Sequence, residues 1–484
     1  MKNIFKTSII IGFASILFTG CEKDWLDVNK NPNKTDKTSP GSLFLGASVD
    51  WSANRMGGDS YIPIGFMNQT ISTGGDSGWG YIDVNVISPY SLGNTWKVFY
   101  ATAGANFKEA IKVAHKNNKP NEEAQAKIAF AGLMYDCTTI FGDVPYKEAW
   151  IDEINYPKFD AQKDILDDLL RLLKEATTQI DKGDGNKIDQ HDLYYKGDLD
   201  KWAALANSLR LKIAMLMVDK DPSKGQVIAE IIKTPLIVEP NQDFKLPFFD
   251  VPGNKNPFYR IVEKYMNGIN SEFYAPESVL DKLMKPLNDP RIPYYYIKGT
   301  KTNEFFGVNV DATEASKEKY AMINMKNIGR ANTADVIVSS SEINLLIAEV
   351  YARGLGVGKD LEKAQQFFNK GIKQSLQEAN VSPSEQDKFL DTESLNLKKV
   401  TDVLDVIHTQ QYINLANRPL DAWTQMRRSG PKGKEIPKLT TPILSPFPKG
   451  EIARRWQYSP DEITANKSAP KIAPQMWEPM WFDE

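Results

Sequence analysis

Residues 339–376 read SSSEINLLIAEVYARGLGVGKDLEKAQQFFNKGIKQSL, and their periodicity says more about the architecture than any other segment. In the first half, apolar residues recur at the spacing of one helical face: Ile343, Leu346, Ile347 and Val350. Gly354, Gly356 and Gly358 then interrupt the pattern, and Asp360 is suited to cap a second helix. The second helix has its own apolar stripe, formed by Leu361, Ala364, Phe368 and Ile372. The pattern predicts a tetratricopeptide-type helical hairpin, a unit that must stack on neighbours to bury its apolar faces.

Weaker versions of this pattern recur along the chain. Together with the segment above, they predict four helical hairpins, near residues 96–141, 161–218, 340–377 and 400–428. Their uneven spacing is not that of a regular repeat array. Three long insertions rich in Gly, Pro, Asn and aromatic residues separate them, near residues 51–95, 236–309 and 440–484. We therefore expect a mainly α fold with four irregular tetratricopeptide-like hairpins and a loop-rich half that contains short β pieces, whose insertions face a ligand.

The N-terminus has the composition of an export signal. Lys2 and Lys6 precede an apolar run over residues 9–18, which is too short to span the roughly 30 Å hydrocarbon core of a bilayer. The run ends in LFTGC, which resembles the bacterial lipobox, although leucine is more usual where Phe18 stands. This resemblance predicts that Cys21 is acylated and becomes the first residue of the mature protein. An ordinary signal peptide with a coincidental cysteine is the alternative.

The expected organisation follows from this anchor. Residues 1–20 are the predicted lipoprotein signal peptide, residues 21–40 an acylated tether, and residues 41–484 the ligand-binding domain. Several acyl chains hold a protein on a bilayer without a spanning helix. Glu22 and Asp24 resemble the acidic signal that routes lipoproteins of the Bacteroidetes group to the cell surface. We expect a lipid-anchored protein of the outer membrane that faces the exterior.

Composition excludes several classes of partner and chemistry. The formal net charge is −3, so there is no basic excess to neutralise a nucleic acid. Besides Cys21, only Cys137 is present, in an apolar segment, so the mature chain is expected to hold no internal disulfide and Cys137 to be a small buried residue. The three histidines lack the spacing of metal ligands, and no nucleophile elbow, phosphate-binding loop or dinucleotide fingerprint is present. We expect no catalytic residues and no cofactor.

One run carries a weak indication of calcium. Residues 181–189 read DKGDGNKID, but they lack the spacing of an EF-hand loop, and Asp192 is the nearest acid to the position where that loop places a glutamate. A solvated turn between two helices accounts for the run equally simply.

The candidate ligand-binding residues lie in two of the insertions. In the first, aromatic and amide side chains stand among glycines that allow close approach of the backbone: Trp51, Tyr61, Gln69, Trp79, Tyr81 and Tyr90. In the second, FFDVPGNKNPFYR supplies Asn254, Asn256, Phe258 and Arg260. Flat aromatic faces beside amides and arginine suit sugar rings, which have an apolar face and a polar rim. The alternative is that these aromatics fix long loops to the scaffold, and that the second run is a turn followed by a helix start.

The chain resembles a known family, the SusD/RagB nutrient-binding outer-membrane lipoproteins. The resemblance covers nearly the whole mature chain. It rests on seven motifs that are each degenerate but occur in a specific order along the chain: DVNKNPNK (27–34), FGDVPYKEAW (141–150), KWAALANSLRLKIAM (201–215), DPRIPYY (289–295), SSSEINLLIAEVYARG (339–354), LDAWTQMRRSG (420–430) and RRWQYSPDEITAN (454–466).

The resemblance implies more than the periodicity does. It implies the SusD-like fold and partnership with a SusC-type TonB-dependent outer-membrane barrel, over which the lipoprotein acts as a hinged lid. It also implies capture of an oligosaccharide or a peptide outside the cell. The ligand positions of the family vary between members and are not transferred to residues here.

Three other functions remain open from the sequence. The same capture role for peptides is one, because aromatic and amide loops suit either ligand. A surface glycoside hydrolase is the second, since it needs only two carboxylates about 5–10 Å apart and the chain has 62 acidic residues. A scaffold without a transport role is the third. We expect glycan capture.

Overall fold

The computed structural model describes residues 38–74, 85–181, 186–265, 273–312 and 315–483. The chain divides into two units by its internal contacts, residues 1–39 and residues 40–484. The following description concerns the second unit. It is mainly helical, which confirms the predicted fold class.

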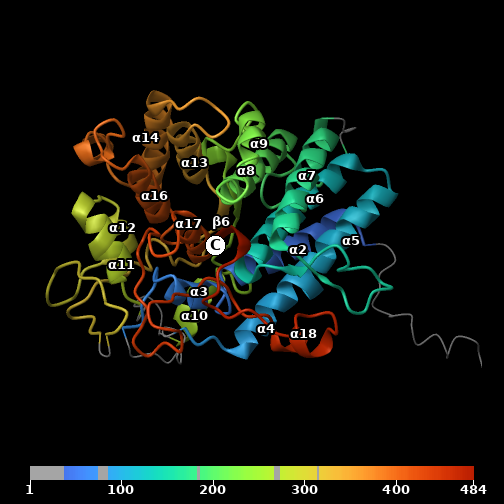
Figure 1. Ribbon diagram of the computed structural model, residues 1–484, viewed down its shortest axis with the longest axis horizontal. Coiled ribbons are helices and arrows are strands. Elements are labelled where there is room, and N and C mark those ends of the chain that lie inside the picture. Colours follow the sequence, from blue (N-terminus) through green and yellow to red (C-terminus); the bar gives the residue numbers. More distant parts are fainter. Residues whose placement is uncertain (1–37, 75–84, 182–185, 266–272, 313–314, 484) are drawn as a thin grey trace, which may run out of the picture. The chain divides into compact units, whose positions relative to one another are not determined.

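In the described part of this unit, four helical hairpins form the scaffold. Their helices are α5 (Ala103–Lys116) with α6 (Pro120–Phe141), α7 (Gln162–Asp181) with α8 (Leu199–Met217), α13 (Ser340–Arg353) with α14 (Leu361–Glu378), and α16 (Val403–Asn414) with α17 (Pro419–Arg428). Contacts run in a continuous series from α5 through α6, α7, α8 and α13 to α16, and Figure 1 shows these helices in neighbouring positions. Each hairpin therefore buries its apolar faces against its neighbours, as stacked hairpins must.

The hairpin of α13 and α14 forms where its local signals predict it. The side chain of Ser339 accepts a hydrogen bond from the backbone N–H of Glu342, and Asp360 accepts one from Lys363, so both helices have N-caps. Gly354 ends α13 with a φ of 73°, in the left-handed region where a Cβ atom is unfavourable.

Other elements connect and flank the hairpins. The helices are α2 (Pro40–Arg55), α3 (Tyr61–Met67), α4 (Pro89–Lys97), α9 (Lys224–Ile231), α10 (Pro257–Tyr265), α11 (Glu277–Val279), α12 (Ile292–Tyr295), α15 (Pro383–Leu390) and α18 (Pro460–Ala465). A π-helical segment, Val98–Thr102, joins α4 to α5. No helix in the described ranges combines the length and the apolarity needed to cross a membrane.

The strands are short and pair in twos, all antiparallel. They are β1 (Val144–Pro145) with β2 (Phe159–Asp160), β3 (Phe244–Leu246) with β6 (Asp335–Val338), and β4 (Tyr296–Ile297) with β5 (Met322–Ile323). In the β3–β6 pair, Phe244 lies opposite Val338 and the register shifts after Phe244. This pair joins the second insertion to the start of α13.

The first insertion contains more helix than its composition predicts. Residues 51–55 belong to α2, residues 61–67 form α3, and residues 89–95 belong to α4. Gly, Asn and Ser weaken helix propensity, but burial of a helical face outweighs that preference. The reason is visible in α2, where Phe44, Ala47 and Trp51 are fully buried and lie on one helical face.

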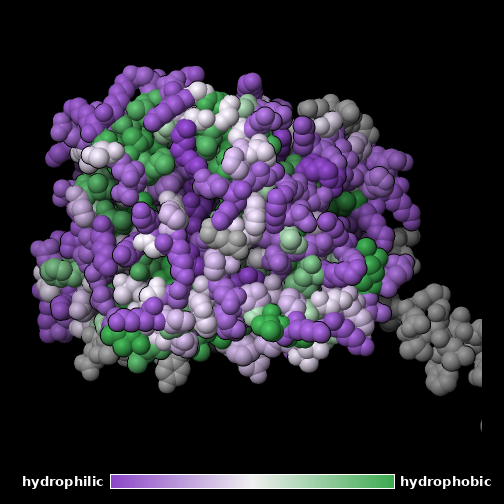
Figure 2. Space-filling view, in the orientation of Figure 1, coloured by the Kyte–Doolittle hydropathy of each residue, from purple (hydrophilic) through white to green (hydrophobic). Residues whose placement is uncertain are grey.

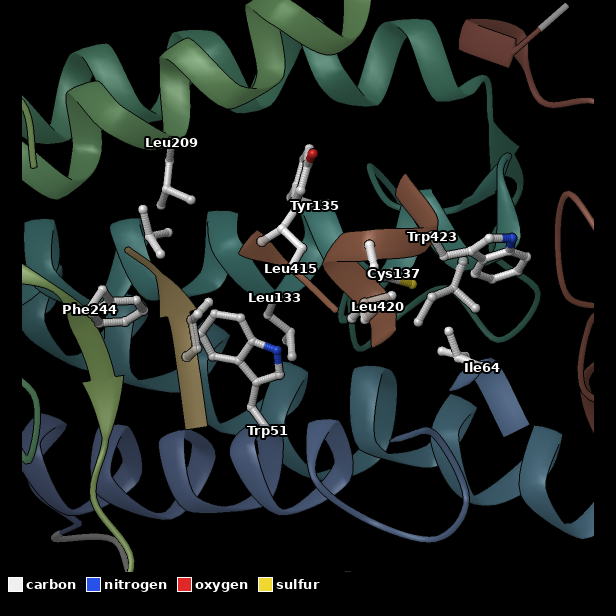
Figure 3. Packing of buried hydrophobic residues seen from close by; sticks show 14 of the residues in the cluster. Trp51, Ile64, Leu133, Tyr135, Cys137, Leu209, Phe244, Leu415, Leu420 and Trp423 are labelled. Atoms are coloured by element: carbon white, nitrogen blue, oxygen red, sulfur yellow. The ribbon is translucent and has the colours of Figure 1, made fainter. Parts of the chain in front are cut away.

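The main core lies between α2, α6, α8, α17 and the β3–β6 pair. Figure 3 shows Trp51 from α2, Leu133 from α6, Leu209 from α8 and Trp423 from α17 directed into it. Cys137 is also buried there and is not in a disulfide, as expected, and burial raises the pKa of its thiol. Figure 2 shows a mostly hydrophilic face with scattered hydrophobic areas.

Candidate ligand-binding site

A buried ionic network connects α2 to the hairpins. The guanidinium group of Arg55, at the end of α2, contacts three carboxylates: Asp136 at 2.7 Å, Asp421 at 2.8 Å and Asp335 at 3.2 Å. Burial works against the charge of Arg55, yet the three carboxylates raise its pKa well above the ordinary value. Arg55 is thereby fixed as a cation.

Asp421 is the centre of this network. Besides Arg55, it contacts Lys212 at 3.2 Å and Arg418 at 3.0 Å. Burial alone would raise its pKa, but the three cations outweigh burial and hold the pKa of Asp421 well below its usual value. Glu342 completes the network by accepting from Lys212 at 2.6 Å and Arg418 at 2.9 Å. Removing one member of such a buried ion group is costly, because it leaves an uncompensated charge in the interior.

An open cavity of about 420 Å³ lies against the outer side of this network, and we name it the polar cavity. Its walls come from segments far apart in sequence: the end of α2, Tyr61 of α3, Lys245 of β3, Tyr294 of α12, residues 327–336, the end of α14 and residues 417–420. Arg55, Asp335 and Arg418 of the network line it. Its volume falls within the range of about 300–1,000 Å³ typical of small-molecule sites.

Seven polar side chains of the cavity wall make no side-chain hydrogen bond or ion pair with any residue of the described ranges. They are Lys245, Tyr294, Arg330, Asn332, Glu378, Asn380 and Asn417. Their donors and acceptors are therefore available to a ligand or to water. Met56, Ile328 and Leu420 add apolar wall. Amide, phenol and charged groups beside a small apolar surface suit a ligand with many hydroxyl groups.

A second recess lies where three loops meet. Gln69 Nε2 donates to the carbonyl of Thr440 at 2.6 Å, Ala315 N–H donates to the carbonyl of Gly74 at 2.8 Å, and Ile443 N–H donates to Asp311 at 2.7 Å. The recess encloses about 20 Å³, close to the space of one water molecule. It is too small for a sugar ring, so the polar cavity is the stronger candidate.

Three of the candidate residues are buried in the interior. Trp51 is fully buried, donates from Nε1 to Asp136 at 2.9 Å and packs on Gly132, where a Cβ atom would lie 2.7 Å from its ring. Asn256 and Phe258 are also fully buried. The Asn256 amide donates to the carbonyl of Thr333 at 2.8 Å. The structure therefore places these three side chains in the interior, where they support the fold, and at neither recess.

Two other candidates lie at the recesses. Tyr61 lines the polar cavity, where its hydroxyl donates to the carbonyl of Asn417 at 3.0 Å and its ring packs on Phe258 with a centroid distance of 4.7 Å. Gln69 lines the small recess. Tyr61 therefore positions the cavity wall and offers it part of a ring face.

The remaining candidates are not brought to either recess or fall outside the description. Tyr90 is 83% exposed in the first turn of α4. Asn254 and Arg260 are exposed near the start of α10. Trp79, Tyr81 and the lipidation site Cys21 lie outside the described residues.

Most of the cavity wall was missed by sequence reasoning. Residues 327–336, with the sequence NIGRANTADV, supply Arg330 and Asn332. The only local signal is a run of turn formers, which is typical of any loop. Lys245, Glu378 and Asn417 join it only through tertiary contacts.

The possible calcium run yields no metal site within the described residues. Among them, no group of three His, Cys, Asp or Glu side chains is placed to hold a metal ion. Asp192 accepts from the backbone N–H of Tyr194, Tyr195 and Gly197 and from Trp202 Nε1, so it ties a turn to α8. Much of the run itself, residues 182–185, lies outside the description.

Comparisons with known proteins agree with the architecture. The model of a SusD-like family, described as starch-binding and associating with the outer membrane, matches residues 35–459. A search of curated proteins found no match. Among solved structures, a chitin-binding protein aligns with a TM-score of 0.77 at 21% identity, over 92% of this chain and 100% of that chain.

Two further structures are similar in the same way. A SusD homologue from Parabacteroides distasonis aligns with a TM-score of 0.75 at 21% identity, over 92% of this chain and 97% of that one. A chitin-binding SusD homologue from Flavobacterium johnsoniae aligns with a TM-score of 0.70 at 18% identity, over 91% and 98%. At these identities the likeness demonstrates a shared fold.

Proposed function

The chain belongs to the SusD-like family, and from that premise we propose that it captures glycan oligomers in the polar cavity and passes them to a SusC-type TonB-dependent transporter. The single observation that carries the proposal is the set of seven unpartnered polar side chains, among the described residues, around a cavity of about 420 Å³. Two solved structures of the same fold are named as chitin-binding, which supports a glycan as the ligand.

The chemistry of the cavity supports a sugar. Hydroxyl groups donate and accept at once, so they pair equally with the amides of Asn332, Asn380 and Asn417 and with the charged groups beside them. Tyr294 is half-buried and contributes a flat surface, as Tyr commonly does at contacts. A sugar that displaces ordered water from such a site loses little affinity when its hydroxyl groups reproduce the hydrogen bonds that the water made.

The proposed location rests on the family and on Cys21. The family is described as associating with the outer membrane. An acylated Cys21, a removed segment of residues 1–20 and a tether over residues 21–40 would hold the domain of residues 41–484 at that membrane, facing outward. The row of hairpins is the surface we propose for docking on the barrel, because stacked hairpins present extended faces.

We propose binding without turnover. Of the two carboxylates that line the cavity, Asp335 is engaged by Arg55, which leaves Glu378 as the carboxylate without a partner in the described residues. A glycoside hydrolase of the usual kind needs two working carboxyl groups. Calcium and other cofactors are not needed for this role.

A second candidate ligand is a peptide. The cavity presents free charges of both signs, Lys245 and Arg330 against Glu378, and the two termini of a short peptide would match them. In that case the transport role is the same and the cargo differs.

Calorimetry separates these proposals. The protein from residue 22 onward would be titrated with chitin and starch oligosaccharides and with a peptide library, while released reducing ends are assayed. We expect saturable glycan binding without product. Product formation would establish an enzyme, peptide binding alone would establish the second candidate, and no binding at all would favour a scaffold.

A matched pair of asparagine variants assigns the binding to the cavity. Asn332→Ala removes a free amide from the cavity wall, whereas Asn254→Ala removes an exposed amide outside it. We expect the first to weaken glycan affinity roughly three- to tenfold, the value of about one hydrogen bond, and the second to leave it unchanged. Equal effects would place the ligand elsewhere.

A further inference from the structure

Three accessible charges in the polar cavity have no ionic partner in the described part of the chain. Lys245 lies on β3, Arg330 lies in the segment of residues 327–336, and Glu378 ends α14; all three are exposed. The other charged groups that line the cavity, Arg55, Asp335 and Arg418, are satisfied within the buried network. The accessible wall therefore presents two cations and one carboxylate.

All three charges line the same cavity as the Tyr294 ring, and two of them act on its phenol. Burial raises the pKa of the Tyr294 phenol, Glu378 adds to that rise, and Arg330 opposes it, which places both charges near the phenol. The charge of Lys245 in turn lowers the pKa of Glu378. A sugar ring on Tyr294 would thus have its substituents within reach of charged groups on three separate elements.

From this arrangement, which rests on the proposed glycan-binding function, we infer that the preferred cargo is an acidic glycan, whose hexuronate carboxylate is bound by Arg330 and Lys245. Arginine and lysine form charge-assisted hydrogen bonds to carboxylates that are about twice as strong as neutral ones. The hydroxyl groups of a neutral glycan can accept hydrogen bonds from both cations, but they bring no negative charge to balance them.

Glu378 opposes an anionic ligand, and its surroundings weaken that opposition. Although the side chain is exposed, desolvation by the surrounding protein raises its pKa, and Asp243 adds to the rise while Arg418 and Lys245 counteract it. Tyr294 and Arg330 are the other titratable or charged groups on the facing wall. The carboxylate thus takes up a proton at higher pH than an ordinary glutamate does.

The buried network does not reverse this preference. It contains four carboxylates, of Asp136, Asp335, Asp421 and Glu342, and the three cations of Arg55, Lys212 and Arg418. Burial raises the pKa of Asp136 and Asp335, so each takes up a proton more readily than an ordinary aspartate does. These groups also contact one another directly, whereas Lys245 and Arg330 face the ligand space.

The test compares acidic glycans with their own neutral forms. Oligogalacturonate, oligoglucuronate and oligoalginate would each be titrated by calorimetry beside the same oligomer after reduction of its carboxyl groups. We expect at least one acidic oligomer to bind about tenfold more tightly than its reduced form, with the difference shrinking as salt rises. Equal affinity of acidic and neutral glycans would overturn the inference and leave the proposed function intact.

Charge variants locate the effect. Arg330→Gln and Lys245→Gln should each weaken binding of the acidic oligomer much more than binding of its reduced form, because the reduced form loses at most one uncharged hydrogen-bond partner. In the unaltered protein, we expect affinity for the acidic oligomer to rise as pH falls from 8 to 5, because Glu378 takes up a proton. Glu378→Gln should strengthen binding of the acidic oligomer severalfold and remove this rise. All three side chains are exposed, so unchanged thermal midpoints are the expected control.

Two results would contradict the proposal at different levels. If the variants leave the acidic preference unchanged, the carboxylate is bound elsewhere and the assignment to Arg330 and Lys245 is wrong. If no glycan binds but acidic peptides do, the glycan function itself is wrong and the peptide alternative replaces it.

Discussion

The hairpin of α13 and α14 and the wall of the polar cavity are built in opposite ways. The hairpin takes its caps, turn and apolar stripes from one continuous segment, residues 339–378. The cavity wall draws on six or more separate segments, and most of its polar side chains have no partner in the described structure. Most side chains of the hairpin contribute to stability, whereas most polar side chains of the cavity wall remain available. Glu378, at the end of α14, is the residue that the two regions share. Substitutions in the hairpin should therefore lower the free energy of unfolding, whereas substitutions in the cavity wall should lower the affinity for the ligand.

The buried network joins these two regions, and breaking it should have the largest effect. Asp421→Ala leaves Arg55, Lys212 and Arg418 without their shared carboxylate in a buried place. Removing one partner of a buried ion group typically costs about 3–5 kcal/mol. Urea denaturation should show this loss in the free energy of unfolding. The exposed Asp405→Ala is the matched control, expected within about 0.5 kcal/mol of the unaltered protein.

The C-terminal segment gives the next largest expected effect, through pH. Asp483 is buried against Arg454, and desolvation raises the pKa of its carboxyl group to about 6 despite that cation. The native state therefore holds a proton that the unfolded state, with a pKa near 3.9, releases first. The stability contribution is complete below about pH 4 and is lost as pH rises through 6. At two pKa units, the loss is at most about 3 kcal/mol.

Asp483→Asn tests this pH dependence. The amide cannot ionise, so the fall in unfolding free energy between pH 4 and pH 7 should be smaller than in the unaltered protein. Unfolding in urea at each pH measures it, with exposed Asp461→Asn as the comparison. Parallel pH profiles for the two variants would mean that another group causes the dependence.

Within the hairpin itself, a backbone effect comes next. Gly354→Ala places a Cβ atom on a residue with a φ of 73°, about 3.0 Å from the backbone nitrogen of Lys359. The left-handed conformation costs a non-glycine residue about 1–2 kcal/mol. The thermal midpoint should fall accordingly, while Gly358→Ala, where a Cβ atom meets nothing within 4 Å, should change it much less.

This contrast also explains what the sequence could predict. The cap that Ser339 forms, the turn at Gly354 and the cap that Asp360 forms each involve residues within five positions, so these roles follow from the local sequence alone. The fold class followed because four such hairpins imply a stacked helical scaffold. Gly-rich surroundings, by contrast, suggested a loop at Trp51, where contacts with Gly132 and Asp136 impose a buried helix.

The site was less predictable for the same reason. Tyr61 was identified from its aromatic character, but its role depends on Asn417, which lies 356 positions away. Arg330 and Asn332 carry no pattern that separates a binding wall from an ordinary turn. Only the tertiary structure brings Lys245, Glu378 and residues 327–336 to one cavity.

The smallest stability effect is the one that distinguishes the two regions most directly. Asn417→Ala removes an amide that has no partner in the described residues, while the carbonyl that Tyr61 uses is retained. Its unfolding free energy should stay within about 0.5 kcal/mol, but glycan affinity should fall roughly three- to tenfold. Asp360→Ala is the mirror experiment, because loss of an N-cap costs about 1 kcal/mol and leaves the cavity untouched. Denaturation should therefore detect a change only in Asp360→Ala, and calorimetry should detect a change only in Asn417→Ala. If instead both variants lost stability and affinity together, the hairpin and the cavity wall would be one energetic unit, and the division of labour between them would be wrong.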